Sequence, residues 1–213
     1  MSNNSSAELQ ARLDRLEADA AIRQLAFGYA LAIDARDLDA IVNLYVDDIK
    51  AGGGQGREAL KAVFDASLRQ FTTSAHHVTN HLIEMLGPDD ALGLVSCRVE
   101  HEVGDQWVTI SLVYHDRYVR RDGVWLFRGR VQSRLYATAH DDPPVGEAKV
   151  RWPGAAPATT AFYDALPSWR EFWDGVEGPA WTGLGADHLV SRLRRGTRLP
   201  PPPVYIFTEQ KPD

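Results

Sequence analysis

The hydrophobic periodicity of the chain changes near Ser74, and this change restricts the folds that it can adopt. Upstream of Ser74, apolar residues recur at three- and four-residue spacing, which is typical of amphipathic helices. Three helices are predicted, from Leu9 to near Asp34, from Leu38 to Tyr45 after a capping Asp37, and from Arg57 to Phe71. The first of them is either one long helix or two abutting ones.

Downstream of Ser74 the period becomes two, which predicts strands. The four candidates are Ala75 to Leu86, Leu92 to Val103, Trp107 to Val119 and Val124 to Thr138. Short segments rich in Gly and Asp join them and favour tight hairpins. Three helices followed by an antiparallel meander predict an α+β fold with the helices packed on one face of the sheet.

The composition shifts after Ala139, which predicts a main domain over residues 1–139 and an extension over 140–213. The extension is rich in proline and tryptophan, with short helices expected near Thr159 to Trp173 and Ala186 to Arg194. It is too aromatic for a disordered tail. We expect it to pack on its own domain or on a neighbouring subunit.

Charge and composition exclude several classes of function. The formal net charge of −6 argues against nucleic acid or an anionic membrane surface as the main partner. No apolar run approaches the length of a membrane span, and Met1 to Ala7 lacks an apolar signal region. The single cysteine, Cys97, excludes an intrachain disulfide and is interpreted as an inert core thiol. These features predict a soluble cytoplasmic protein.

Asp34 and His76 form the strongest candidate for chemistry. An imidazole suits proton abstraction near neutral pH, and a carboxylate on its other nitrogen would fix the tautomer and stabilise the imidazolium. Such a pair needs no cofactor. Spacing by itself leaves another interpretation open, in which Asp34 only ends a helix and His76 is a polar strand residue.

Three segments carry a resemblance to a known family. The stretch from Ile22 to Val46, the strand from His76 to Asn80 and the hairpin from Arg120 to Trp125 resemble the SnoaL-like branch of the nuclear transport factor 2-like superfamily. The resemblance covers about Ala7 to Thr138. This branch is similar to scytalone dehydratase, bile-acid 7α-dehydratase and hexachlorocyclohexane dehydrochlorinase.

The resemblance implies a cone-shaped barrel, in which a curved antiparallel sheet and three helices enclose a deep pocket, and eliminations run by an Asp–His dyad. The family aspartate falls on Asp34 and the family histidine on His76. Tyr29 matches a tyrosine of the bile-acid dehydratase, and Arg130 matches a basic residue of the dehydrochlorinase. The dehydrochlorinase has lysine at the position of Tyr29, which argues against dehydrochlorination of the same substrate.

Further side chains are candidates for substrate binding. Because adjacent strand residues point to opposite faces, only one of His76 and His77 can enter the pocket. Counting back from the hairpin turn places His76 roughly opposite His101, which would bring His101 near the pocket; the alternative is a solvated histidine of the hairpin. Arg130 or Arg134 would stabilise negative charge if it faces the cavity, and an inward arginine predicts an acid partner or an anionic substrate. The remaining candidates are Tyr45 and Tyr114, which the pattern also favours as core aromatics.

Two other motifs carry no chemistry. His77 and His81 share one face of an ideal strand but lack a nearby carboxylate, so no metal site is predicted. The run from Gly52 to Gly56 lacks the Lys-Ser/Thr pair of a phosphate loop and is interpreted as a turn.

The sequence favours a cofactor-independent lyase that eliminates a small group from a bulky aromatic, polyketide or steroid-like molecule. In this hypothesis His76 is the general base and Asp34 orients it. Tyr29 positions a substrate oxygen, and Arg130 stabilises the charge that develops during the reaction. The alternatives are carbon–carbon cleavage of a lignin-derived diarylpropane, isomerisation and non-catalytic binding of a small molecule. A homo-oligomer is expected, a trimer by resemblance or else a dimer.

Overall fold

The computed structural model describes residues 2–146 and 148–159 and confirms the α+β class. Three helices come first, namely α1 (Ser2–Asp34), α2 (Leu38–Asn43) and α3 (Arg57–Leu68). Four long strands follow, namely β3 (Thr73–Met85), β4 (Asp90–Val103), β5 (Gln106–Arg121) and β6 (Val124–Ala139). A small hairpin, β1 (Lys50–Ala51) with β2 (Gly54–Gln55), lies between α2 and α3. The expected extension from 160 onward, with its two predicted helices, lies outside the described residues.

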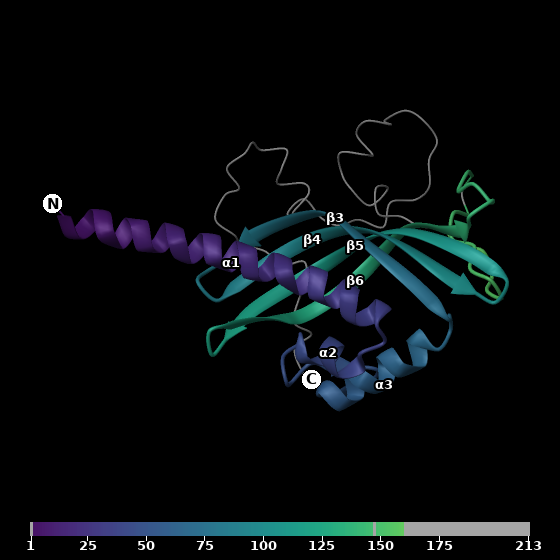
Figure 1. The fold of residues 1–213 in the computed structure, drawn as a ribbon, viewed down its shortest axis with the longest axis horizontal. Helices are drawn as coiled ribbons and strands as arrows, with labels where there is room; N and C mark the ends of the chain where they lie inside the picture. Colours follow the sequence, from purple (N-terminus) through teal and green to yellow (C-terminus); the bar gives the residue numbers. More distant parts are fainter. Residues whose placement is uncertain (1, 147, 160–213) are drawn as a thin grey trace, which may run out of the picture.

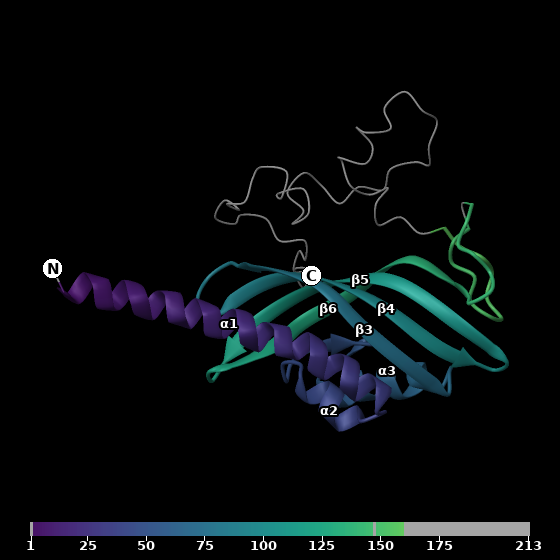
Figure 2. The ribbon, with the colours of Figure 1, turned by 45° about the horizontal axis from the view of Figure 1, so that its top comes forward.

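The four long strands form one antiparallel sheet in the order β3-β4-β5-β6. The three helices lie on the same side of this sheet. α1 runs diagonally across it, and α2 and α3 lie near the C-terminal end of α1 (Figures 1 and 2). Each strand pairs with its neighbour in sequence because the connections are short hairpins. This arrangement leaves a space between the sheet and α3.

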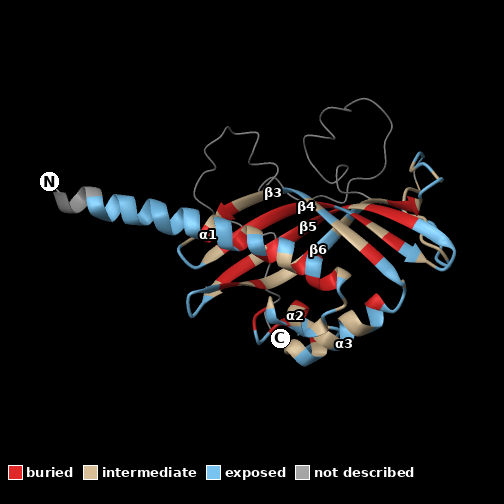
Figure 3. Cartoon of the chain, viewed as in Figure 1, coloured by how far each residue is buried: buried red, intermediate tan, exposed pale blue. Residues whose placement is uncertain are grey.

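The hydrophobic core lies where the second half of α1 crosses the sheet. Ile22 and Ala26 of α1 are fully buried, as are Tyr118 and Phe127 of the sheet. The first half of α1 extends past the edge of the sheet, and its residues 6–17 are exposed (Figure 3). Leu9, whose spacing helped to predict the helix, is therefore 56% exposed. The helical pattern was correct, but its first leucines have no described element to pack against.

Local signals set the helix boundaries closely. The carboxylate of Asp37 accepts a hydrogen bond from the backbone amide of Ala40 at 2.9 Å, as expected of an N-cap. The glycine run forms a turn, with Gly52 and Gly53 at φ of +59° and +79°, where glycine has little steric cost. α1 is a single helix. No described helix is long and apolar enough to cross a membrane.

A β-bulge in β3 changes which side chains share a face. Val78 pairs with Cys97 but His81 pairs with Val95, so β3 holds one extra residue at this point. His81 therefore lies on the same face as His76 and Val78, opposite to His77. The premise that His77 and His81 share a face was wrong, because strict alternation does not survive a bulge. Within the described residues, no group of potential ligands could hold a metal ion.

Candidate active site

A cavity of about 1360 Å³ lies between the concave face of the sheet, α1, α3 and the segment after β6. Its apolar walls come mainly from Ile33, Leu60, Phe64 and Ile110. Among the predicted residues, those that line the cavity are His76, Tyr29, Arg130, Tyr45, His101, Tyr114 and Arg134. Val150 and Trp152 close one side, so the first part of the extension lies on the pocket of its own chain.

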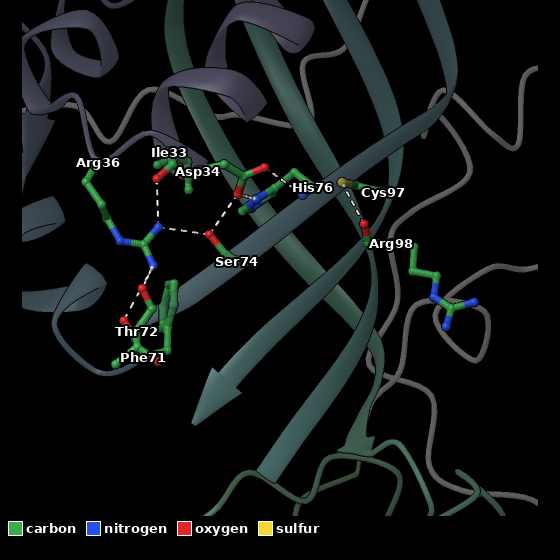
Figure 4. A network of polar contacts seen from close by, with 9 residues as sticks. All are labelled: Ile33, Asp34, Arg36, Phe71, Thr72, Ser74, His76, Cys97 and Arg98. Carbon is green, nitrogen blue, oxygen red and sulfur yellow. Dashed lines mark hydrogen bonds and ion pairs between the residues drawn. The ribbon is translucent and has the colours of Figure 1, made fainter. Parts of the chain in front are cut away.

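Asp34 and His76 contact each other (Figure 4), and of the two only His76 lines the cavity. The Nδ1 atom of His76 lies 2.7 Å from Oδ1 of Asp34, and the His76 backbone amide donates to Oδ2 at 2.8 Å. The His76 side chain is 6% exposed and the Asp34 side chain is 25% exposed. Burial would raise the pKa of Asp34, but hydrogen bonds from the His76 ring, the His76 amide and Ser74 outweigh it and lower the pKa. An ionised Asp34 requires a proton on Nδ1, which leaves Nε2 as the basic nitrogen.

Arg36 and Ser74 hold the carboxylate of Asp34 in place (Figure 4). The Ser74 hydroxyl donates to Oδ1 of Asp34 at 2.7 Å and accepts from Nη1 of Arg36 at 2.9 Å. Arg36 also donates to the carbonyls of Ile33 and Thr72 and lies 4.7 Å over the ring of Phe71. Its φ of +60° is unusual for a residue other than glycine and stores strain. We infer that these contacts offset that strain and join the end of α1 to the start of β3.

Replacing Ser74 with alanine should raise the pKa of Asp34. The folded-state pKa of Asp34 lies below the unfolded value, so its ionisation contributes stability that is present above the unfolded pKa and lost as pH falls through the folded pKa. Without the Ser74 hydroxyl this loss still begins at the unfolded pKa but is smaller and ends at higher pH, and the free energy of unfolding at neutral pH falls by about 1 kcal/mol. Urea unfolding between about pH 7 and pH 3 measures both effects.

Thr79→Val is the matched control. The Thr79 hydroxyl also leaves β3, but it donates to the neutral carbonyl of Ser96 at 3.1 Å. Its loss should lower stability by a similar amount at every pH. If Ser74→Ala and Thr79→Val have the same acid profile, Ser74 does not tune the carboxylate.

His101 lies beside the pair but not in the expected register. His76 pairs with Val99, and His101 pairs with Ser74, two residues from the predicted position. A shift of two residues keeps both side chains on the same face of the sheet. The ring centroids of His76 and His101 are 6.2 Å apart. Phe71 and Trp152 pack edge-on against His101, with ring centroids at 4.3 and 5.5 Å. Burial, with the charges of His76 and Arg36, lowers the pKa of His101 to about 4, so this ring is neutral near pH 7.

Tyrosine and arginine side chains form the deep end of the cavity. The guanidinium of Arg130 lies 4.4 Å from the ring centroid of Tyr29 and 4.2 Å from that of Tyr114. Burial raises the pKa of Tyr29 to about 12, despite the opposing charge of Arg130. Tyr29 therefore keeps its proton and can donate a hydrogen bond. Burial also raises the pKa values of Tyr45 and Tyr114 well above the usual range.

Arg130 has the acid partner that an inward arginine predicts. Its Nε and Nη2 atoms donate to the two oxygens of Asp116 at 2.8 and 2.6 Å. The two side chains are 4% and 0% exposed, so this is a buried bidentate pair. Tyr118 also donates to Asp116 at 2.6 Å, and its hydroxyl lies 3.0 Å from Nε2 of His81. A Cβ on Gly93 would lie 2.7 Å from the Tyr118 ring, so this network requires glycine there.

Sequence reasoning missed Asp116, Tyr118, Arg36 and Ser74. Asp116 carried a usable signal, because it is the only carboxylate in β5 and lies midway between Tyr114 and Tyr118 in the strand. It lies two residues from Tyr114, hence on the same strand face. Arg36 and Ser74 carried no comparable signal, since both look like ordinary polar residues at the end of an element.

A family model for the SnoaL-like domain matches residues 14–131, more than half of the chain. The chain belongs to the SnoaL-like family. Gamma-hexachlorocyclohexane dehydrochlorinase of Sphingobium indicum is 31% identical over 144 residues, which cover 62% of this chain and 92% of that relative. The resemblance predicted from sequence is confirmed.

Solved structures of SnoaL-like relatives agree with this assignment. The crystal structure of LinA is 30% identical, with a TM-score of 0.57, and the match covers 62% of this chain and 99% of LinA. The type-3 hexachlorocyclohexane dehydrochlorinase of Novosphingobium barchaimii is 28% identical with a TM-score of 0.56, and its match covers 62% of this chain and 99% of that protein. These matches cover nearly the whole length of the two relatives and about three fifths of this chain.

Proposed function

We propose that this protein is a cofactor-independent lyase that removes water or another small group from a bulky, largely apolar molecule. The observation that carries the proposal is the 2.7 Å contact between Asp34 and His76 in the wall of a large cavity. Distant homology to hexachlorocyclohexane dehydrochlorinases supports elimination as the reaction type. Convergence of a base, a tyrosine donor and a guanidinium on one cavity favours an enzyme over a binding module.

The elimination follows from the protonation states. Nε2 of neutral His76 takes a proton from a substrate carbon, while Asp34 stabilises the imidazolium through Nδ1. The electron pair of the broken C–H bond forms the new double bond as the leaving group departs. Tyr29 donates a hydrogen bond to the substrate oxygen, and the imidazolium returns its proton when the leaving group is hydroxide. Such base catalysis contributes roughly two to four orders of magnitude in rate.

Carbon–carbon cleavage is the second candidate, and Trp152 favours it. This tryptophan lines the cavity together with Phe64, and a volume of about 1360 Å³ exceeds that of most small-molecule sites. Two aromatic walls and this volume suit a two-ring substrate of the diarylpropane type. His76 would then take a proton from a primary hydroxyl group, whose C–O bond becomes the carbonyl of formaldehyde. The electron pair of the cleaved carbon–carbon bond would form a new double bond as the neighbouring hydroxyl group leaves as water.

Product analysis without added cofactor tests the proposal and separates the two reactions. We expect the enzyme to convert a member of a panel of hydroxylated aromatic ketones, chlorinated cyclohexanes and diarylpropane diols. Mass spectrometry would detect the loss of water, hydrogen chloride or formaldehyde. His77→Ala is the control, because His77 is exposed and lies on the other face of β3. A product of unchanged mass would indicate isomerisation and contradict both candidates. The predicted homotrimer and cytoplasmic location stay predictions.

A further inference from the structure

The lining of the cavity has an imbalance of charge. Its cationic side chains are Lys50, Arg117, Arg128, Arg130 and Arg134, and within the described part of the chain no aspartate or glutamate lines it. The whole chain has the opposite balance, with 29 acidic and 23 basic residues. Positive charge is therefore concentrated at this one site. A concave, partly apolar surface strengthens such a field and attracts anions.

Three of these cations are already neutralised. Asp116 binds Arg130 through two hydrogen bonds, as described above. Nη2 of Arg117 lies 3.1 Å from Oδ2 of Asp90, and Nη1 of Arg128 lies 2.8 Å from Oδ1 of Asp48. Because these arginines each have a carboxylate partner, none of them is the first choice to bind an anion.

Arg134 differs from these three. No carboxylate among residues 2–146 and 148–159 lies within ion-pair distance of its guanidinium, and the same is true of Lys50. Lys50 lies in the short β1 strand, whereas Arg134 lies in β6 and follows Arg130 and Gln132 along the wall of the cavity. Its positive charge also contributes to the low pKa of His101, after burial and the charges of His76 and Arg36. The field of Arg134 therefore reaches the ring beside His76.

The sheet fixes the separation between Arg134 and the base. Arg134 pairs with Leu112, Leu112 with Cys97 and Cys97 with Val78, which is two residues from His76 on the same strand face. Three strand spacings separate β6 from β3, which is about 14 Å between their backbones. Both residues line the cavity, and Arg134 is exposed to solvent. A molecule of two aromatic rings with a terminal charged group would span this separation.

We propose that the substrate of this site is an aromatic carboxylate, whose anionic group binds the guanidinium of Arg134 while its apolar body lies toward Tyr29 and His76. Guanidinium groups bind carboxylates through two parallel hydrogen bonds, which fixes orientation as well as adding affinity. The inference rests on the proposed function, because it names the substrate class of the same site.

A pair of probes that differ only in charge tests this inference by binding alone. The probes are 2-naphthoate and its neutral amide, 2-naphthamide, titrated by isothermal calorimetry into the full chain. We expect naphthoate to bind at least about tenfold more tightly than naphthamide, a difference of about 1.4 kcal/mol, because hydrogen bonds to charged groups are stronger than those to neutral ones. Arg134→Gln should remove this preference, and Arg134→Lys should keep part of it.

Arg98→Gln is the matched control, because it makes the same change in net charge. Arg98 lies in β4, pairs with His77 and does not line the cavity. This variant should keep the full preference for naphthoate. His76→Ala should also keep it, so a failure of catalysis is separable from a failure of anion binding. Equal affinities for the two probes, no binding of either, or an unchanged preference in Arg134→Gln would overturn the inference.

Discussion

Replacing His76 with alanine should abolish turnover and leave the fold intact. Among the described residues that line the cavity, His76 is the only one whose ring Nδ1 is held by an ionised carboxylate. Its Nε2 is therefore free to act as the base. Its removal deletes the general base, whose contribution is roughly two to four orders of magnitude in rate. The side chain lies at the wall of a cavity, so truncation enlarges that cavity without exposing the core. Steady-state kinetics and a thermal unfolding curve of the same sample measure both properties.

Asp34→Asn should lower turnover nearly as much, for a different reason. The amide keeps the shape of the side chain but loses the charge that stabilises the imidazolium and holds the proton on Nδ1. A comparable change in a serine protease triad costs about four orders of magnitude. His77→Ala, with no contact to Asp34, should retain wild-type rates. Turnover that survives in both His76→Ala and Asp34→Asn would remove the dyad mechanism.

Asp116→Asn should produce the largest loss of stability among single substitutions in the site. Arg130 is almost fully buried, and Asp116 neutralises it through two short hydrogen bonds. An uncompensated charge at a site excluded from water costs about 3–5 kcal/mol. The contacts of Arg130 with the rings of Tyr29 and Tyr114 are present with and without Asp116, so they do not offset this cost. Urea unfolding at neutral pH measures the change.

Asp48→Asn provides the contrast, because it breaks the ion pair with Arg128. Asp48 is 61% exposed in its side chain, so water screens the pair and the loss should not exceed about 1 kcal/mol. The double substitution Asp116→Asn with Arg130→Met should be more stable than Asp116→Asn, since it removes the charge that was left unpaired. Equal losses for Asp116→Asn and Asp48→Asn would show that burial of the Arg130 pair has no energetic consequence.

Much of the fold was predictable because its signals are local. Asp37 caps α2 as its position predicts, and the strands begin and end within a few residues of the expected limits. Turn residues and hydrophobic periodicity act over a few neighbouring positions, so they can be recognised in the sequence without knowledge of tertiary contacts. The candidate pair of Asp34 and His76 is separated by 42 residues, and only the family resemblance connected them beforehand.

Which strand residues share a face of the sheet, and which charged groups pair, were less predictable. The bulge in β3 moves His81 to the side of His76, and the true register places His101 opposite Ser74. A bulge depends on how two strands fit together, and a change of one residue reverses every facing beyond it. The partner of Arg130 was predicted as a type, an acid, but its identity as Asp116 required the coordinates.

The sequence by itself therefore determined which elements form, in what order, and which family the chain resembles. The tertiary structure decided which polar groups meet, namely Ser74 with Asp34, Asp116 with Arg130, and no described carboxylate with Arg134. The physical reason is the distance along the chain over which each kind of interaction acts. Hydrogen-bonding propensity and hydrophobic period act along the chain, whereas charge compensation inside a cavity depends on groups brought together from strands and helices far apart in sequence.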